Sequence, residues 1–334
     1  MTVTRLSGRA PSSFLGLVIA AGCVSGVLVG LGMSVVSAAP GLVEPATAVR
    51  IGLPLARMAI MLAAVVVVGA ALLPFLVGTR RRAASRVAVV GSAVWVVAAL
   101  ACLVLDIATV HVGHQITGEM IVWHITGFRT GTALALVMAG AVVNLVVAAV
   151  AVRRDVPVLL PLVIATFTVL PLPPSGHSFD APDGVLALGV LGLELHVLAV
   201  TAWTGGLLAV AIAAGAQREL LADALPRFSR LATVCIFVAA IAGVVSGVLH
   251  LVVSPDVQWF SALFTTTYGR ILVLKGVLLT AAGLLGAHIR FRLLSSIRAQ
   301  RPTAFVRWAA LELAVMGLAF GLAAVLARSP VDAI

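Results

Sequence analysis

Charged residues are scarce in this chain of 334 residues, because they make up 10% of it against 62% hydrophobic residues. Its mean hydropathy is +1.19. Soluble domains carry about 25% charged residues, so this composition excludes an ordinary soluble protein. It predicts a polytopic membrane protein, since apolar runs of about 20 residues cross the hydrocarbon core as helices.

The sequence motifs of common enzyme classes are also missing. The chain has no Walker loop, no GxSxG elbow, no HExxH and no dinucleotide-binding fingerprint, so we expect no enzymatic activity. Its basic residues stand in short clusters between apolar runs and form no extended basic surface interleaved with aromatics. Nucleic acid is therefore not an expected partner.

Cysteine is rare. Cys23, Cys102 and Cys235 each stand alone inside an apolar segment, and no CxxC pair occurs. This usage indicates neither a disulfide framework nor a zinc site. We expect all three to be small core residues.

Apolar runs separated by Arg, Pro, Gly or Asp predict an all-α bundle of nine transmembrane helices. The first run is longer than the usual signal-peptide core, so we expect it to remain as a span. The predicted spans are 14–36, 53–77, 87–107, 131–151, 157–173, 185–213, 229–252, 269–290 and 305–327.

The basic residues predict the orientation of this bundle. Most of the 22 lie in segments that share one side of the membrane with the N-terminus when nine spans are counted. Positively charged short loops stay in the cytoplasm, so we predict a cytoplasmic N-terminus and an extracytoplasmic C-terminus. We divide the chain into an N-terminal region of five helices with outer His-bearing loops, residues 1–180, and a four-helix region, residues 181–334.

All but one of the seven histidines fall on the outer side or within the membrane in this topology. Only His288 lies near the cytoplasmic face. Neutral imidazole binds copper without importing a charge, so these side chains are candidate metal ligands. The candidates are His196, His177, His250, His111, His114 and His124.

The outer connection after the third span gathers several of them. His111 and His114 are three residues apart, and Glu119, Met120 and His124 follow. Imidazole and thioether are suitable copper ligands, and the soft sulfur of methionine favours Cu(I). The alternative is a solvated loop whose histidines bind nothing.

The sixth span carries the most distinctive polar groups. Glu194 and His196 lie near the middle of the membrane, where such groups usually face a bundle interior or a polar cavity. Two residues correspond to about 200° of helix, so both cannot face one point. We expect His196 to face inward and Glu194 to flank it; helix-packing hydrogen bonds are the alternative for both.

The last two spans add further polar groups. Tyr268 and Lys275 open the eighth span. We expect Lys275 to extend outward toward the interface, with a counter-charge to Glu194 or Asp106 as the alternative. We take Glu312 in the ninth span to be structural, paired with Arg307 or with a neighbouring helix.

The residues from His196 through Trp203 to Gly205 and Gly206 resemble the H-x6-W-x-G-G signature of the copper resistance protein D (CopD) family. Further matching segments follow in the family's order. They are Arg227-Phe-Ser-Arg230-Leu-Ala, Gly243-Val244 with Ser246-Gly247, Tyr268-Gly269-Arg270 with Lys275, and Glu312 at the place of the last-span acid. The matching region covers residues 185–328, and the Gly176-His177 loop also fits.

This resemblance implies an actinobacterial-type protein of the bacterial plasma (inner) membrane that handles copper. It implies that copper passes toward the cytoplasm, often beside a periplasmic copper-binding protein. We expect any such partner, or an oxidase assembly factor, to be a separate chain. Trp203, Tyr268, Lys275, Glu194 and Asp106 would then line the pathway, together with Glu119 and Met120 in the outer connection.

Two other functions fit the same residues. Histidines on facing helices can ligate haem axially, which would make the chain an electron-transfer protein. Depth argues against this reading, because His196 lies near the midplane and His250 near the outer surface. The other alternative is a scaffold or assembly factor without a ligand, whose polar groups serve helix packing.

Overall fold

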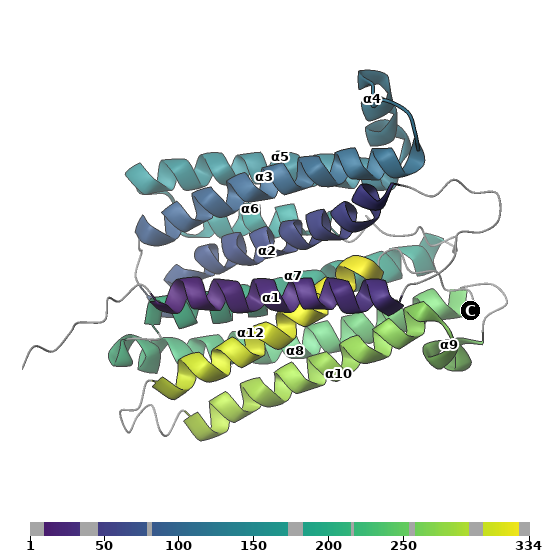
Figure 1. Ribbon diagram of the computed structural model, residues 1–334. Helices are drawn as coiled ribbons and strands as arrows, with labels where there is room; N and C mark the ends of the chain where they lie inside the picture. Colours follow the sequence, from purple (N-terminus) through teal and green to yellow (C-terminus); the bar gives the residue numbers. More distant parts are fainter. Residues whose placement is uncertain are drawn as a thin grey trace, which may run out of the picture.

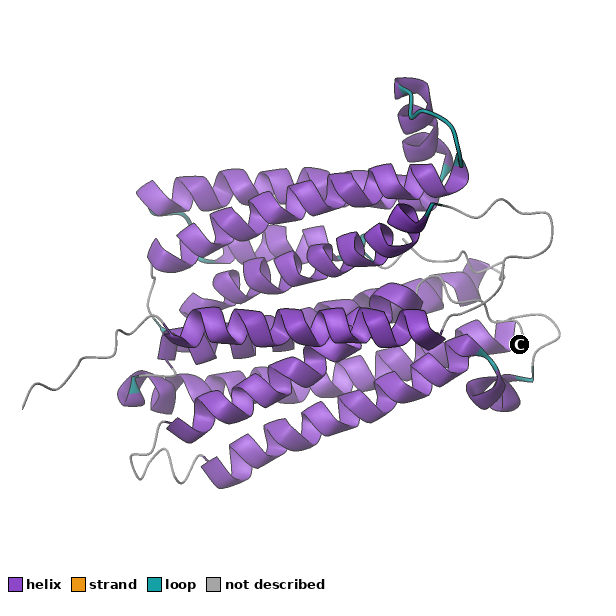
Figure 2. Ribbon diagram, in the orientation of Figure 1, coloured by secondary structure: helices purple, strands orange, loops and turns teal. Residues whose placement is uncertain are grey.

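The structure is a computed structural model that describes residues 10–33, 46–78, 82–172, 183–214, 217–253, 258–293 and 303–326. Every regular element in these ranges is a helix, as Figure 2 shows, and this confirms the predicted all-α class. The long helices are α1 (Ala10–Met33), α2 (Thr47–Val77), α3 (Arg82–Val110), α5 (Arg129–Arg153), α7 (Asp183–Ala214), α8 (Arg218–Val253), α10 (Thr267–His288) and α12 (Thr303–Leu326).

Eight helices in the described ranges are long and apolar enough to cross a membrane. They coincide with eight of the nine predicted spans. The predicted fifth span, 157–173, contains instead the 11-residue α6 (Leu159–Val169). At a rise of 1.5 Å per residue, α6 is about 16 Å long, roughly half the hydrocarbon thickness. Pro171 follows α6 and has no N–H with which to extend the helical hydrogen bonds.

The helices run in alternating directions along the bundle (Figure 1). α5 ends and α6 begins at one end of the bundle, whereas α7 begins at the opposite end. Between the start of α6 and the start of α7 the chain therefore passes from one end of the bundle to the other, although α6 is short. α1 begins at one end and α12 finishes at the other, as an odd number of crossings requires.

Two short helices lie at the end of the bundle where α12 finishes (Figure 1). α4 (Gly118–Gly127) projects sideways from the bundle, and α9 (Trp259–Thr265) lies beside α10. Both carry exposed aromatic side chains, among them Trp123, Trp259 and Phe260. Aromatic residues gather where a membrane meets water, so these helices mark one membrane surface, the one that the charge pattern predicts to be outer.

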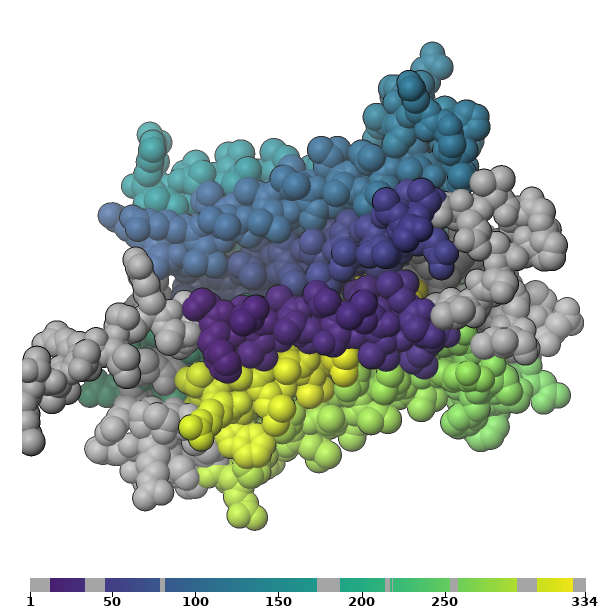
Figure 3. Space-filling model, viewed as in Figure 1, coloured from purple at the N-terminus to yellow at the C-terminus, as the bar shows by residue number. Residues whose placement is uncertain are grey.

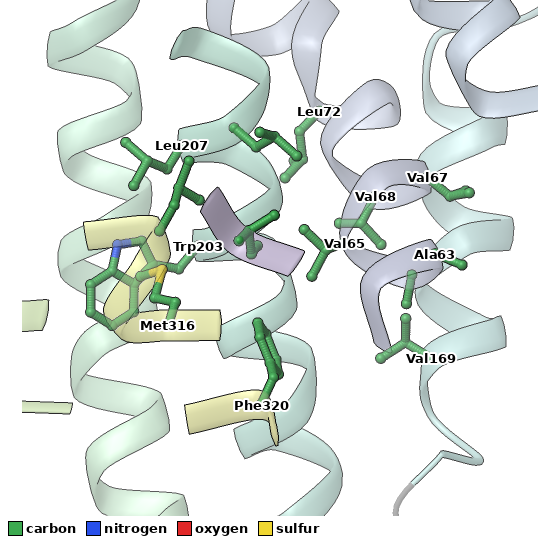
Figure 4. Close-up of a cluster of buried hydrophobic side chains, with 14 of the residues drawn as sticks. Ala63, Val65, Val67, Val68, Leu72, Val169, Trp203, Leu207, Met316 and Phe320 are labelled. Carbon is green, nitrogen blue, oxygen red and sulfur yellow. The ribbon is translucent and has the colours of Figure 1, made fainter. Parts of the chain in front are cut away.

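Helix packing brings the two ends of the sequence together. α2 packs between α3 and α7, and α7 also packs on α8. α1 lies along α12, as the adjoining purple and yellow surfaces in Figure 3 show. At the centre of the bundle, Trp203 and Leu207 of α7 meet Met316 and Phe320 of α12 beside α2 (Figure 4).

Glycine permits the closest of these contacts. A Cβ atom on Gly22 of α1 would lie 2.5 Å from the carbonyl oxygen of Ala314, and one on Gly317 of α12 would lie 2.5 Å from that of Ile19. α2 and α7 meet in the same way at Gly69 and Gly205. Small residues at such spacing let membrane helices approach backbone to backbone, where dispersion forces and weak hydrogen bonds hold them together.

We predict that Gly22→Val separates α1 from α12 and destabilises the protein by about 1–3 kcal/mol, as overpacking of a tight interface does. Gly16→Val is the matched control on the same helix, because nothing lies within 4 Å of a Cβ atom built there. Thermal unfolding of the purified variants measures the difference. Equal losses of stability in both variants would contradict the assignment of this interface.

Candidate functional site

A cluster of buried polar groups lies at the predicted outer end of the bundle, between α2, α3 and α4. Nε2 of His124 on α4 is 3.1 Å from Oδ2 of Asp106 on α3. Nη2 of Arg57 on α2 lies 3.7 Å from Oδ1 of the same carboxylate. The His124 side chain is 1% exposed. Three segments of the chain thus enclose one carboxylate.

Local structure at both ends of α4 holds His124 in this position. The Thr117 side chain accepts a hydrogen bond from the backbone N–H of Met120 and caps the first turn. Past the end of α4, Gly131 of α5 packs directly on His124. A Cβ atom at Gly131 would lie 2.8 Å from Cδ2 of the His124 ring. A larger residue at position 131 would push the imidazole away from Asp106.

The hydrogen bond to Asp106 determines which nitrogen of His124 is protonated. An ionised carboxylate only accepts hydrogen bonds, so Nε2 donates its proton to Oδ2. Nδ1 is then left with a free lone pair in the neutral ring. It is buried and has no hydrogen-bond partner within the described ranges. A histidine that binds a metal usually donates its other N–H to a carboxylate or a backbone carbonyl in this way.

His111 lies near the same cluster. Its ring centroid is 5.7 Å from that of Trp123, which packs edge-on against Phe128, and Phe128 in turn lies 5.0 Å from the ring of His124. Nε2 of His111 is buried and makes no hydrogen bond to any described residue. Two imidazoles with free buried nitrogens thus border one aromatic cluster.

The other candidate ligands in the segment between α3 and α5 lie away from the Asp106–His124 cluster. His114 is exposed, and its Nδ1 donates to the carbonyl oxygen of Val112 at 3.1 Å. Glu119 is exposed in the first turn of α4, and Met120 packs half-buried against the hydrophobic core. His177 lies outside the described residues. Among the described residues, no group of three or more His, Cys, Asp or Glu could hold a metal ion.

His196 is held by the same kind of hydrogen bond farther into the bundle. Its Nδ1 donates to the carbonyl oxygen of Ala239 on α8 at 2.7 Å, which leaves the lone pair on Nε2. Gly243 of α8 lies against the ring: a Cβ atom there would be 2.7 Å from Nδ1.

The charged candidates Glu194 and Lys275 make no ion pair with each other in the structure. Glu194 is half-buried and makes no ion pair with another described residue. Lys275 is half-buried and pairs with neither Glu194 nor Asp106 within 4.0 Å. The counter-charge of Asp106 comes from Arg57 instead, a partner that spacing along the sequence does not reveal.

His250 lies on α8 at a different depth in the bundle from His196. Its ring lies 4.7 Å from that of Tyr268 on α10. Seven residues separate it from Gly243, which corresponds to about 10 Å along the helix. His196 and His250 therefore do not face each other across one haem, and the axial pair that haem binding requires is not formed by these two residues.

Trp203, which the family resemblance places along the pathway, forms a buried pair with Glu312, which the sequence analysis took to be structural. Nε1 of Trp203 donates to Oε1 of Glu312 at 2.9 Å. Oε2 of Glu312 is buried without a hydrogen-bond partner in the described part of the chain. The sequence carried one signal for this pair: an acid in an otherwise apolar span rarely lacks a role. The neighbouring helix, and not Arg307, provides the partner.

We predict that Gly243→Ala displaces His196 from the Ala239 carbonyl. Losing that hydrogen bond lowers the free energy of unfolding by about 1–2 kcal/mol. Gly276→Ala on α10 is the control, because nothing lies within 4 Å of its added methyl group. Removing glycine from a helix interior there raises the stability by about 0.5–1 kcal/mol. Thermal unfolding that shifts both variants in the same direction would rule out a tight contact at Gly243.

Comparison with known proteins gives two matches to family models. The model described as "Copper resistance protein D-like, N-terminal domain" matches residues 46–190, and the one described as "Copper resistance protein D" matches residues 222–326. No curated protein and no solved structure shows significant similarity to the chain. Together the two matches cover most of the chain, with α2 to α6 in the first and most of α8, with α9 to α12, in the second. The chain therefore belongs to the copper resistance protein D family and is a multi-pass protein of the plasma membrane.

Proposed function

We propose that the chain takes up copper at the outer surface of the membrane and delivers it inward along a series of histidines. The family indicates a role in copper resistance or uptake. Our proposal adds a capture site at His111 and His124, with His177 and His250 on the same side, and a deeper contact at His196. Moving copper in this way requires no covalent reaction, so we propose that the protein is not an enzyme.

The state of the His124 ring carries this proposal. Asp106 accepts the Nε2 proton and so directs the lone pair of Nδ1 away from the carboxylate. The same carboxylate increases the basicity of the ring, which strengthens binding of a metal at the other nitrogen. A buried nitrogen without a hydrogen bond is costly, and a metal ion would satisfy it. We propose His111 as a second ligand, since both rings border the aromatic cluster of Trp123 and Phe128.

His196 supports the second step of the proposal. The Ala239 carbonyl orients its ring as Asp106 orients that of His124, although a backbone carbonyl brings no charge. A neutral ligand suits the middle of the membrane, where each additional charge costs about 2.5–3.5 kcal/mol even on lenient scales. Glu194, two residues earlier, would contribute negative potential to the pathway without binding the metal.

The two regions of the chain would have different roles in copper uptake. We propose that residues 1–180 capture copper, because they hold the outer cluster, and that residues 181–334 conduct it, because they hold His196 and Trp203. A separate periplasmic copper-binding protein would load the capture site from the outer surface. The projecting α4, with Trp123 and Val122 exposed, is positioned at that surface.

We expect His124→Ala to abolish copper binding at the outer site, and Asp106→Asn to weaken it by about 10–100-fold, the usual effect of losing a carboxylate partner of a ligating histidine. His288→Ala is the control, because His288 stacks on Trp308 at the opposite end of the bundle. Competition with a chromophoric copper chelator measures these affinities in purified protein.

An affinity that stays the same in His124→Ala would contradict the capture site. A visible spectrum of the same preparation tests the alternative of haem binding, because bound haem gives a Soret band and Cu(I) does not. Purified protein that holds neither copper nor haem would favour the alternative function, a scaffold or assembly factor without a ligand.

A further inference from the structure

A cavity of about 310 Å³ lies in the half of the bundle opposite to the outer histidines. It is lined by residues of α7, α8, α10 and α12 and of the π-helical turn η2 (Ile289–Leu293) that continues α10. Its lining is almost entirely apolar, with Phe228, Phe237 and Phe291 among its walls. Glu312 is the acidic residue of this lining.

The Glu312 carboxylate is fixed on one side and free on the other. Oε1 accepts the hydrogen bond from Trp203, whereas Oε2 has no partner among the described residues. The side chain is 1% exposed and lies against Gly286 of α10. A Cβ atom there would lie 3.4 Å from Oε1 and 3.7 Å from Oε2.

No described cation neutralises this carboxylate. Arg290 is the charged residue of the cavity lining besides Glu312, but its Nη1 donates to Oγ1 of Thr233 at 2.7 Å, and its side chain is exposed. His288 stacks on Trp308, and the α7 and α8 residues of the lining are not titratable. An ionised carboxylate buried without a cation is very costly in an apolar surrounding, so something else must balance its charge.

The lining of the cavity includes residues from the predicted inner end of the bundle. Exposed Arg290 and Phe291 lie on the π-helical turn, and Arg290 joins this turn to α8 through Thr233. α10 packs mainly on α12 and touches α8 little, so the gap between α8 and α10 stays unfilled. π-helical turns of this kind occur frequently at functional sites.

From these contacts we infer that Glu312 is a proton-binding site that exchanges its proton with the inner aqueous phase through this cavity. Oε2 takes the proton from a hydronium ion and leaves water, and in the reverse step it returns the proton to water. Oε1 stays bonded to Trp203 in both states. Proton exchange does not depend on copper, so it is tested on metal-free protein.

Infrared difference spectra of the wild-type protein in lipid nanodiscs, recorded while the pH is cycled, test this inference. We expect the C=O stretching band of a buried protonated carboxylic acid to appear and disappear reversibly in the wild type and in Glu219→Gln, which removes an exposed carboxylate outside the cavity. The band should be lost in Glu312→Gln, which keeps the acceptor for Trp203. A wild-type spectrum without a reversible band, or a Glu312→Gln spectrum that retains it, would overturn the inference.

A second pair of variants tests the route. Gly283 lines the cavity and has nothing within 4 Å of an added Cβ atom, so Gly283→Phe fills the cavity. Gly276 on the same helix has equally open surroundings but is not part of the lining, so Gly276→Phe is the control. Tryptophan fluorescence after a rapid pH jump follows the exchange, because Trp203 is hydrogen-bonded to Glu312. We expect the rate to fall about tenfold in Gly283→Phe only. Equal rates in the two variants would exclude this cavity as the route.

Discussion

The absence of water inside a bilayer is the constraint on which this structure depends. Each polar group there needs a partner from the protein, and every unpaired one is costly. His124, His196 and Glu312 satisfy this constraint only in part. One atom of each is held by a hydrogen bond, and for His124 and Glu312 the other polar atom is buried and unpartnered. Such atoms are available to a ligand or a proton, as we propose for His124 and Glu312.

Close packing of small residues makes these arrangements possible. Gly243 lets α8 contact the His196 ring, and Gly131 lets α5 contact the His124 ring. The same property joins α1 to α12 through Gly22 and Gly317. Glycine therefore has two uses in this bundle: it brings backbones together where helices must bind each other, and it makes room for polar side chains where helices must stay apart.

Much of the fold could be predicted from the sequence, because hydropathy reports directly on membrane spans. The 17-residue window 157–173 did not become a full helix, since hydropathy does not register that Pro171 ends the hydrogen bonding of α6. The site was harder to predict, because its pairs join residues far apart in sequence. His111, His114 and His124 looked alike as neighbours, and only the turn before α4 separates an exposed His114 from a buried His124. Arg57 and Glu312 gained their partners only through the packing of helices.

X-ray absorption at the copper edge tests the central claim most directly, because it reports the atoms bound to the metal. Copper-loaded wild-type protein should show imidazole nitrogen in the first coordination shell, and the number of these ligands should decrease in His124→Ala. A copper spectrum that is identical in the wild type and in His124→Ala, or one without imidazole scattering, would contradict the account.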